Sequence, residues 1–229
     1  MATSVAFIVL TVVMYVLVLA LLKHVLNRTD WDENRKKSLH RRVTLTLLGW
    51  GILICLLAAF GVLGNFSSFP PPMAIVLVVP LVVSLLVTFS KSLGALIPFV
   101  EPSEIIRLQV FRLFVEILLW LLYIQQLLPT QMTFEGRNFD VLTGLTAPLV
   151  AFAFGKNKTV MIGWNMICLG LLANIVAIAV LSMPTPFRIF LNEPPNTIVS
   201  TFPFVLLPGL LVPLAYTLHF ISLRQLLRR

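Results

Sequence analysis

Long apolar runs restrict what this chain can fold into more than any other feature of its sequence. A helix needs about 20 residues to cross the hydrocarbon core of a bilayer, which is about 30 Å thick. Candidate segments are Ser4–Leu22, Val43–Gly64, Met73–Phe89, Ile105–Leu128, Val141–Phe154, Val160–Met183 and Phe202–Leu223. We therefore predict an all-α membrane protein, a seven-transmembrane-helix bundle that forms one domain over residues 1–229.

The composition supports this prediction. The chain is 59% hydrophobic and 11% charged, whereas soluble domains are about half apolar and a quarter charged. Ser4–Leu22 follows no basic residue and lacks a small-residue cleavage site, so we expect a retained helix and not a secretory signal. Cys55 and Cys168 lie inside apolar runs, which favours a packing role for both.

The fifth segment, Val141–Phe154, is short for a span, because its residues reach only about 21 Å as a helix. The distribution of charge still favours counting it. With the N-terminus outside and the C-terminus cytoplasmic, the outward loops hold only Arg137 and Arg188. The inward side then holds Lys23 to Arg42, Lys91, Lys156, Lys158, Arg224, Arg228 and Arg229. Cytoplasmic loops of membrane proteins are enriched in Lys and Arg in this way.

The formal charge of +8 does not indicate nucleic acid as a partner. Seven of the 17 basic residues lie between Lys23 and Arg42 and three end the chain, which is the pattern of cytoplasmic loops. The expected partner is the lipid bilayer, whose anionic headgroups the Lys23–Arg42 loop would meet.

Two partial similarities suggest an internal duplication. Gly49-Trp50 with Ile54-Cys55-Leu56 resembles Gly163-Trp164 with Ile167-Cys168-Leu169, and Val79-Pro80-Leu81 resembles Val212-Pro213-Leu214. The corresponding arrangement is three helices, a linking fourth and three more. A chance match between Leu-rich segments is the alternative.

The fourth segment carries the most informative polar residues. Steps of three or four place six side chains on one helix face: Gln109, Arg112, Glu116, Trp120, Tyr123 and Gln126. Charged side chains at this depth are costly and usually paired or functional. We expect Arg112 and Glu116 to form an i, i+4 pair on a face that points into the bundle.

This face has two interpretations. It is a site for a solute or a proton, in which Arg112 pairs with a solute carboxylate and Glu116 takes a proton, or it is a buried pair that only fixes packing. Asn174 and His219 are the candidate partners from other helices, although such residues more often make interhelical hydrogen bonds. Prolines at 80, 208 and 213 predict helix breaks of the kind that can line a cavity.

Two outward loops are polar and rich in proline. Their charged residues would form an ionic lid over the outer mouth: Glu135, Arg137, Asp140, Arg188 and Glu193. The alternative is that Asp140 caps the fifth helix and the other four pair at the surface.

Motifs for nucleotide binding, zinc proteases and serine hydrolases are absent from the sequence. We accordingly predict no cofactor, no metal and no catalytic residues.

Gln131 to Ala147, Ser182 to Arg188 and Leu211 to His219 resemble segments of an uncharacterised group of bacterial multi-pass inner-membrane proteins. The three-one-three plan is similar to that of the seven-helix sugar carriers of the SWEET type. The bacterial group has no assigned activity, and the likeness to the carriers concerns the fold alone. The polar face of the fourth segment is the reason to expect a small-solute transporter or permease, and the resemblance to the bacterial group implies the bacterial inner membrane. A sensor, assembly factor or partner subunit that does not transport is the alternative.

Overall fold

The computed structural model describes residues 1–228, which form helices joined by turns and loops, with no strand in that range. Five helical stretches are long and apolar enough to cross a membrane: α1 (Ala2–Asn27), α2 (Glu33–Ala59), α3 (Pro72–Phe89), α8 (Lys158–Leu181) and Leu207–Arg228. The last stretch joins a π-helical turn, η5 (Leu207–Leu211), to α9 (Val212–Arg228). These helices indicate membrane association.

Local signals explain where several helices begin. Asp32 precedes α2 and its carboxylate accepts a hydrogen bond from Asn34 N at 3.0 Å. The Asn157 side chain caps α8 in the same way, through Val160 N at 3.1 Å. Pro72 starts α3, where the missing N–H costs nothing. Each start satisfies or removes backbone donors that have no partner inside the helix.

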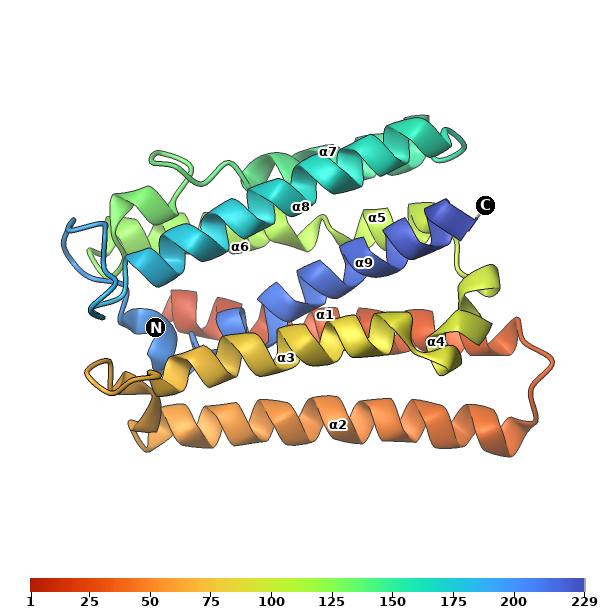
Figure 1. The fold of residues 1–229 in the computed structure, drawn as a ribbon, viewed down its shortest axis with the longest axis horizontal. Helices are drawn as coiled ribbons and strands as arrows, with labels where there is room; N and C mark the ends of the chain where they lie inside the picture. The colour runs from red at the N-terminus through yellow and green to blue at the C-terminus, as the bar shows by residue number, and fades with distance from the viewer. Residues whose placement is uncertain (229) are drawn as a thin grey trace.

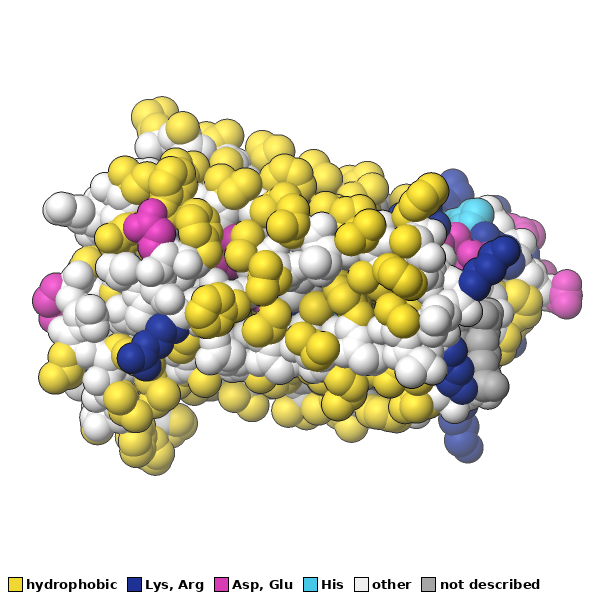
Figure 2. Space-filling view, turned by 90° about the horizontal axis from the view of Figure 1, so that it is seen from above, with side chains coloured by type: hydrophobic (Ala, Val, Ile, Leu, Met, Phe, Trp, Pro, Cys, Tyr) yellow, Lys and Arg dark blue, Asp and Glu magenta, His cyan; other side chains and the backbone are white. Residues whose placement is uncertain are grey.

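The helices lie roughly along one axis, and the two chain ends lie at opposite ends of it (Figure 1). The middle of the molecular surface is apolar, and most Lys and Arg side chains in view gather at the end where the C-terminus lies (Figure 2). Helix α2 shows the apolar exterior most clearly, because Leu45, Ile52 and Leu56 are exposed while Ile54 is buried. An apolar exterior of this kind suits lipid and not water as the surrounding solvent.

The predicted bounds of the first, third and sixth segments agree best with the observed helices α1, α3 and α8. Helix α2 differs, because it begins at Glu33 although the sequence prediction placed its start at Val43. The predicted inward loop Lys23–Arg42 is therefore largely helical, and only residues 28–32 separate α1 from α2. The basic residues of this region extend the two helices beyond their apolar parts.

The fourth predicted segment, Ile105–Leu128, is not one continuous helix. It consists of α5 (Pro102–Leu108) and α6 (Phe111–Ile124), which follow a short α4 (Lys91–Leu96). The fifth segment is α7 (Val141–Ala153), an apolar helix shorter than a full span. A count of seven full-length helices is thus not what the structure shows.

Glycine explains how α7 packs against the α5–α6 break. A Cβ on Gly144 would collide with the backbone nitrogen of Leu113, so only glycine allows this approach. Backbone hydrogen bonds around the break join residues three apart and not four, such as Arg112 N to Gln109 O at 3.1 Å. The break and the start of α7 therefore lie against each other inside the bundle.

Candidate functional site

The segment between α6 and α7 turns back into the bundle and runs along α6. It brings three of its side chains to three side chains of that helix: Glu135 to Trp120, Asn138 to Glu116, and Asp140 to Arg112. Arg112 lies about 18 Å from the C-terminal end of α6, given the rise of a helix per residue. Helix α7 begins inside the bundle at the level of Arg112, and not level with the C-terminal end of α6.

Arg112 and Asp140 form a buried ion pair at the C-terminal end of this segment, directly before α7. Arg112 Nε donates to Asp140 Oδ2 at 2.6 Å, and Arg112 Nη2 donates to Asp140 Oδ1. Arg112 is 2% exposed and Asp140 3% exposed. Two parallel N–H···O bonds give a guanidinium and a carboxylate their strongest geometry. Arg112 therefore pairs with Asp140 across the chain, and the predicted i, i+4 pair with Glu116 is wrong.

His219 of α9 extends this ion pair with a further contact to Arg112. Arg112 Nη1 lies 2.9 Å from His219 Nε2, and His219 Nδ1 lies 2.9 Å from Asn165 Oδ1 on α8. Arginine can only donate, so Nε2 must accept and the ring proton must be on Nδ1. This assignment is consistent with Asn165, whose Nδ2 donates to Ser222 Oγ at 3.0 Å and to a backbone carbonyl.

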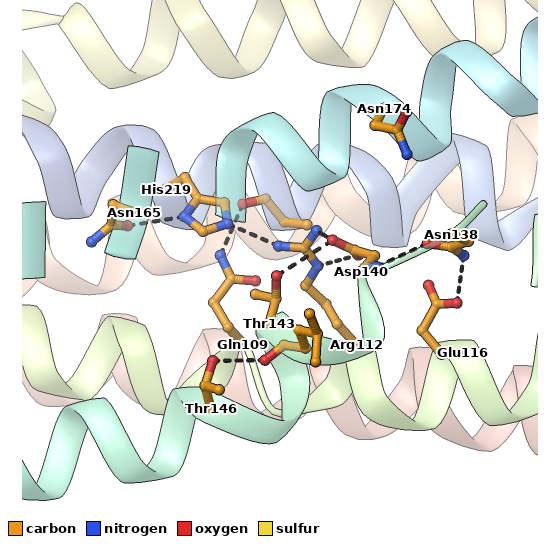
Figure 3. Close-up of polar contacts among 12 residues, drawn as sticks. Gln109, Arg112, Glu116, Asn138, Asp140, Thr143, Thr146, Asn165, Asn174 and His219 are labelled. Atoms are coloured by element: carbon orange, nitrogen blue, oxygen red, sulfur yellow. Dashed lines mark hydrogen bonds and ion pairs between the residues drawn. The ribbon is translucent and has the colours of Figure 1, made fainter. Parts of the chain in front are cut away.

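A row of buried polar groups results (Figure 3). It comprises Ser222, Asn165, His219, Arg112, Asp140, Asn138 and Glu116. Asn138 joins its two neighbours, because its Oδ1 accepts from Asp140 N at 3.0 Å while its Nδ2 donates to Glu116 Oε2 at 2.5 Å. Buried polar groups are tolerated when they are paired in this way.

A cavity of about 70 Å³ adjoins the row, and Arg112, Glu116 and Asp140 form part of its wall. Its other walls are mainly apolar side chains of α3, α6, α8 and α9. Residues of the segments that connect the helices also line it, among them Met132, Asn196 and Val199. The volume accommodates a few water molecules, and it is far below the roughly 300–1,000 Å³ of pockets for drug-sized ligands.

Three irregular stretches of backbone meet at this cavity: the α5–α6 break, the start of α7 and the π-helical turn η5. Pro213 leaves a carbonyl of η5 without its helical donor, and the indole Nε1 of Trp50 donates to Gly209 O at 2.9 Å. Inside a membrane, irregular backbone is tolerated where it is packed in protein or lines a cavity. π-Helical turns are also frequent at functional sites.

The structure brings together part of the predicted site. Arg112, Glu116 and His219 lie in one row, whereas Asn174 is exposed on α8 and donates to Arg137 O at 3.0 Å (Figure 3). Trp120 lies nearer the C-terminal end of α6 and donates to Glu135. Tyr123, near the end of α6, is also not part of the row.

The five charged residues of the two predicted outward loops have different partners and do not form one ionic cluster among the described residues. Arg188 pairs with Glu193 at 3.1 Å, and Arg137 lies 5.4 Å from the ring of Phe190. Glu135 accepts from Trp120 Nε1 at 2.6 Å. Asp140 turns inward, and although it precedes α7 its carboxylate makes no capping bond to the helix backbone.

The sequence prediction missed Asn138 and Asn165 and misassigned Asp140. One signal was available in the sequence. The fifth segment is too short to span a bilayer and follows an acidic residue, as expected for a helix that begins inside the membrane. A buried arginine also requires an acid, and Asp140 is 28 residues away along the chain. Asn165 carried no such signal, since the two side chains that it contacts, His219 and Ser222, come from α9.

Comparisons with known proteins add a family but no activity. No curated protein matches the chain, and no solved structure matches it. A family model matches residues 70–227, which covers more than half of the chain and includes every member of the buried polar row. The chain belongs to the family described as "Domain of unknown function (DUF8737)".

Proposed function

We propose that the chain is a polytopic membrane protein with seven crossings, its N-terminus outside and its C-terminus in the cytoplasm of a bacterial cell. The two shorter crossings are α5–α6 together and α7 preceded by its inward-turning segment. Two observations support this topology. The chain ends lie at opposite ends of the bundle, and basic side chains gather at the end where the C-terminus lies (Figures 1 and 2).

The function that the geometry supports best is the transport of a small solute or ion through the bundle. The observation that carries this proposal is the cavity at the meeting point of three irregular backbone stretches, with Arg112, Glu116 and Asp140 in its wall. Broken helices with ionisable residues near the membrane centre are a feature of secondary transporters. The cavity admits only a few waters, so an organic solute requires a wider conformation.

The charges of the site restrict the solute. Asp140 already occupies both donors of Arg112 that a solute carboxylate would use. A small cation or a neutral solute therefore fits better than the carboxylate that the sequence alone suggested. The three-one-three duplication and the likeness to SWEET-type carriers stay predictions.

A function without transport is the second candidate, and one observation favours it. Arg112 has protein partners on both sides, Asp140 and His219, so the row satisfies itself without a ligand. In that case the row fixes how the helices pack, and the protein acts as a sensor, assembly factor or partner subunit.

Flux measurements on proteoliposomes distinguish the two candidates. The probes are methylammonium, glycerol and alanine, followed by the change in liposome volume after mixing. Transport predicts faster flux of at least one probe than in empty liposomes, and loss of this flux in the Arg112→Gln, Glu116→Gln double variant. Glu193→Gln is the control, because its exposed carboxylate lies in an outer loop. Equal flux from the wild type and the double variant would contradict the site.

A further inference from the structure

Glu116 is a buried acid whose only hydrogen-bond partner within residues 1–228 is a neutral group. It is 1% exposed, and its Oε2 accepts from Asn138 Nδ2 at 2.5 Å. Its Oε1 makes no hydrogen bond to any residue that the structure describes, and the side chain lies in the cavity wall. The nearby guanidinium of Arg112 is already held by Asp140.

The formal charges around the cavity do not balance. Arg112 contributes one positive charge, and Asp140 and Glu116 contribute two negative charges if both are ionised. The pair of Arg112 with Asp140 cancels, so the excess negative charge belongs to Glu116. An unpaired charge in the centre of a membrane helix is costly. One bound positive charge at Glu116 would remove this cost.

We propose that Glu116 is a proton-binding site that is loaded through the cavity from the outer side. A hydronium ion that reaches the cavity transfers its proton to Oε1, which forms an O–H bond and gives a neutral carboxylic acid and a water molecule. Asn138 Nδ2 donates to Oε2 in both protonation states, so it holds the side chain without fixing its charge.

The groups that face Glu116 provide no other positive charge to replace the proton. Arg112 lies on the same helix and Asp140 precedes α7, and they neutralise each other. Cys168 of α8 and Tyr216 and His219 of α9 are the other titratable groups of this region, and His219 accepts from Arg112. Helix α3 contributes Met73 and Leu77 to the cavity wall, and the core that α6 shares with α1 is formed by apolar side chains such as Phe7 and Met14.

The cavity extends from Glu116 toward one end of the bundle. It extends to Met132, Met183, Asn196 and Val199 in the outer part of the molecule. Asn196 is fully buried in this wall, and its Oδ1 has no protein partner among the described residues, so water is the natural donor to it. Toward the inner side, the ion pair of Arg112 and Asp140 separates Glu116 from His219. A fixed guanidinium in the path opposes the passage of a proton.

Infrared spectroscopy of the purified protein in detergent tests the proposal. A protonated carboxylic acid has a C=O stretching band that a carboxylate lacks. The wild type should show such a band, and its intensity should change as the pH of the buffer is changed. The band should be lost in Glu116→Gln and retained in Glu135→Gln, whose carboxyl group is exposed. No acid band at any pH at which the protein stays folded would overturn the proposal.

A second measurement does not depend on the folding of any variant. Wild-type protein labelled with ¹³C at the glutamate carboxyl groups should show the band at lower frequency. A band that keeps its frequency belongs to an aspartate, and this result would overturn the assignment. The proposal shares its site with the proposed transport but is tested without flux. A titrating Glu116 without flux would leave the proton site intact and refute transport, whereas flux without the band would do the reverse.

Discussion

The pairing of Arg112 with Asp140 leads to the sharpest prediction of this structure. Replacing Asp140 with Asn leaves the guanidinium buried without a counter-charge. Breaking a buried ion pair on one side costs about 3–5 kcal/mol. We therefore expect Asp140→Asn to lower the free energy of unfolding by about that amount, a large part of the stability of a typical domain.

A double-mutant cycle isolates the interaction itself. The variants are Arg112→Gln, Asp140→Asn and the combination of the two, and unfolding is followed in mixed micelles as denaturing detergent is added. Residues in direct contact have coupling energies of about 0.5–3 kcal/mol, and we expect this buried bidentate pair to lie near the upper limit. The double variant should lose less stability than the sum of the single variants, because it removes both charges.

Two further cycles act as controls. In the pair of Arg188 with Glu193, the Glu193 side chain is 70% exposed. The coupling energy of this pair should therefore not exceed about 1 kcal/mol. The cycle of Arg112 with Glu116 tests the pair that the sequence suggested. A coupling of Arg112 to Glu116 as large as that to Asp140 would refute the arrangement described above.

Three other predictions concern packing, and the same unfolding measurement tests each. Gly144→Ala should lower the free energy of unfolding by about 1–3 kcal/mol, because the added Cβ collides with the backbone of Leu113. Gly170→Ala is the control, because this position on α8 is in open space and the change should be neutral or stabilising. Equal effects of the two substitutions would contradict the close approach of Gly144 to Leu113. Trp50→Phe should cost about 1–3 kcal/mol by leaving Gly209 O without its donor, and an unchanged unfolding midpoint would show that this carbonyl has another partner. Gln225→Met should raise stability by about 1 kcal/mol, because both polar side-chain atoms of Gln225 are buried without a partner among the described residues; a loss of stability would instead indicate bound water.

Local pattern determined the membrane class of this protein. Apolar runs such as Ser4–Leu22 and Met73–Phe89 correspond to helices because a segment in lipid must satisfy its own backbone. The same logic places Arg112 and Glu116 in the interior, since neither charge can face the hydrocarbon at low cost. Both conclusions depend on residues close together along the chain.

Only the tertiary structure decided what these buried charges meet. Asp140 reaches Arg112 because the segment before α7 turns into the bundle, and His219 reaches it from a helix 107 residues away. Helical spacing pointed to Glu116 as the partner of Arg112, yet a guanidinium binds whichever carboxylate offers both oxygens in its plane. As a result, Glu116 lies beside the cavity and its hydrogen-bond partner in the described part of the chain is the amide of Asn138. Its environment, and the proton site proposed from it, therefore follow from contacts between distant segments and not from the order of residues in α6.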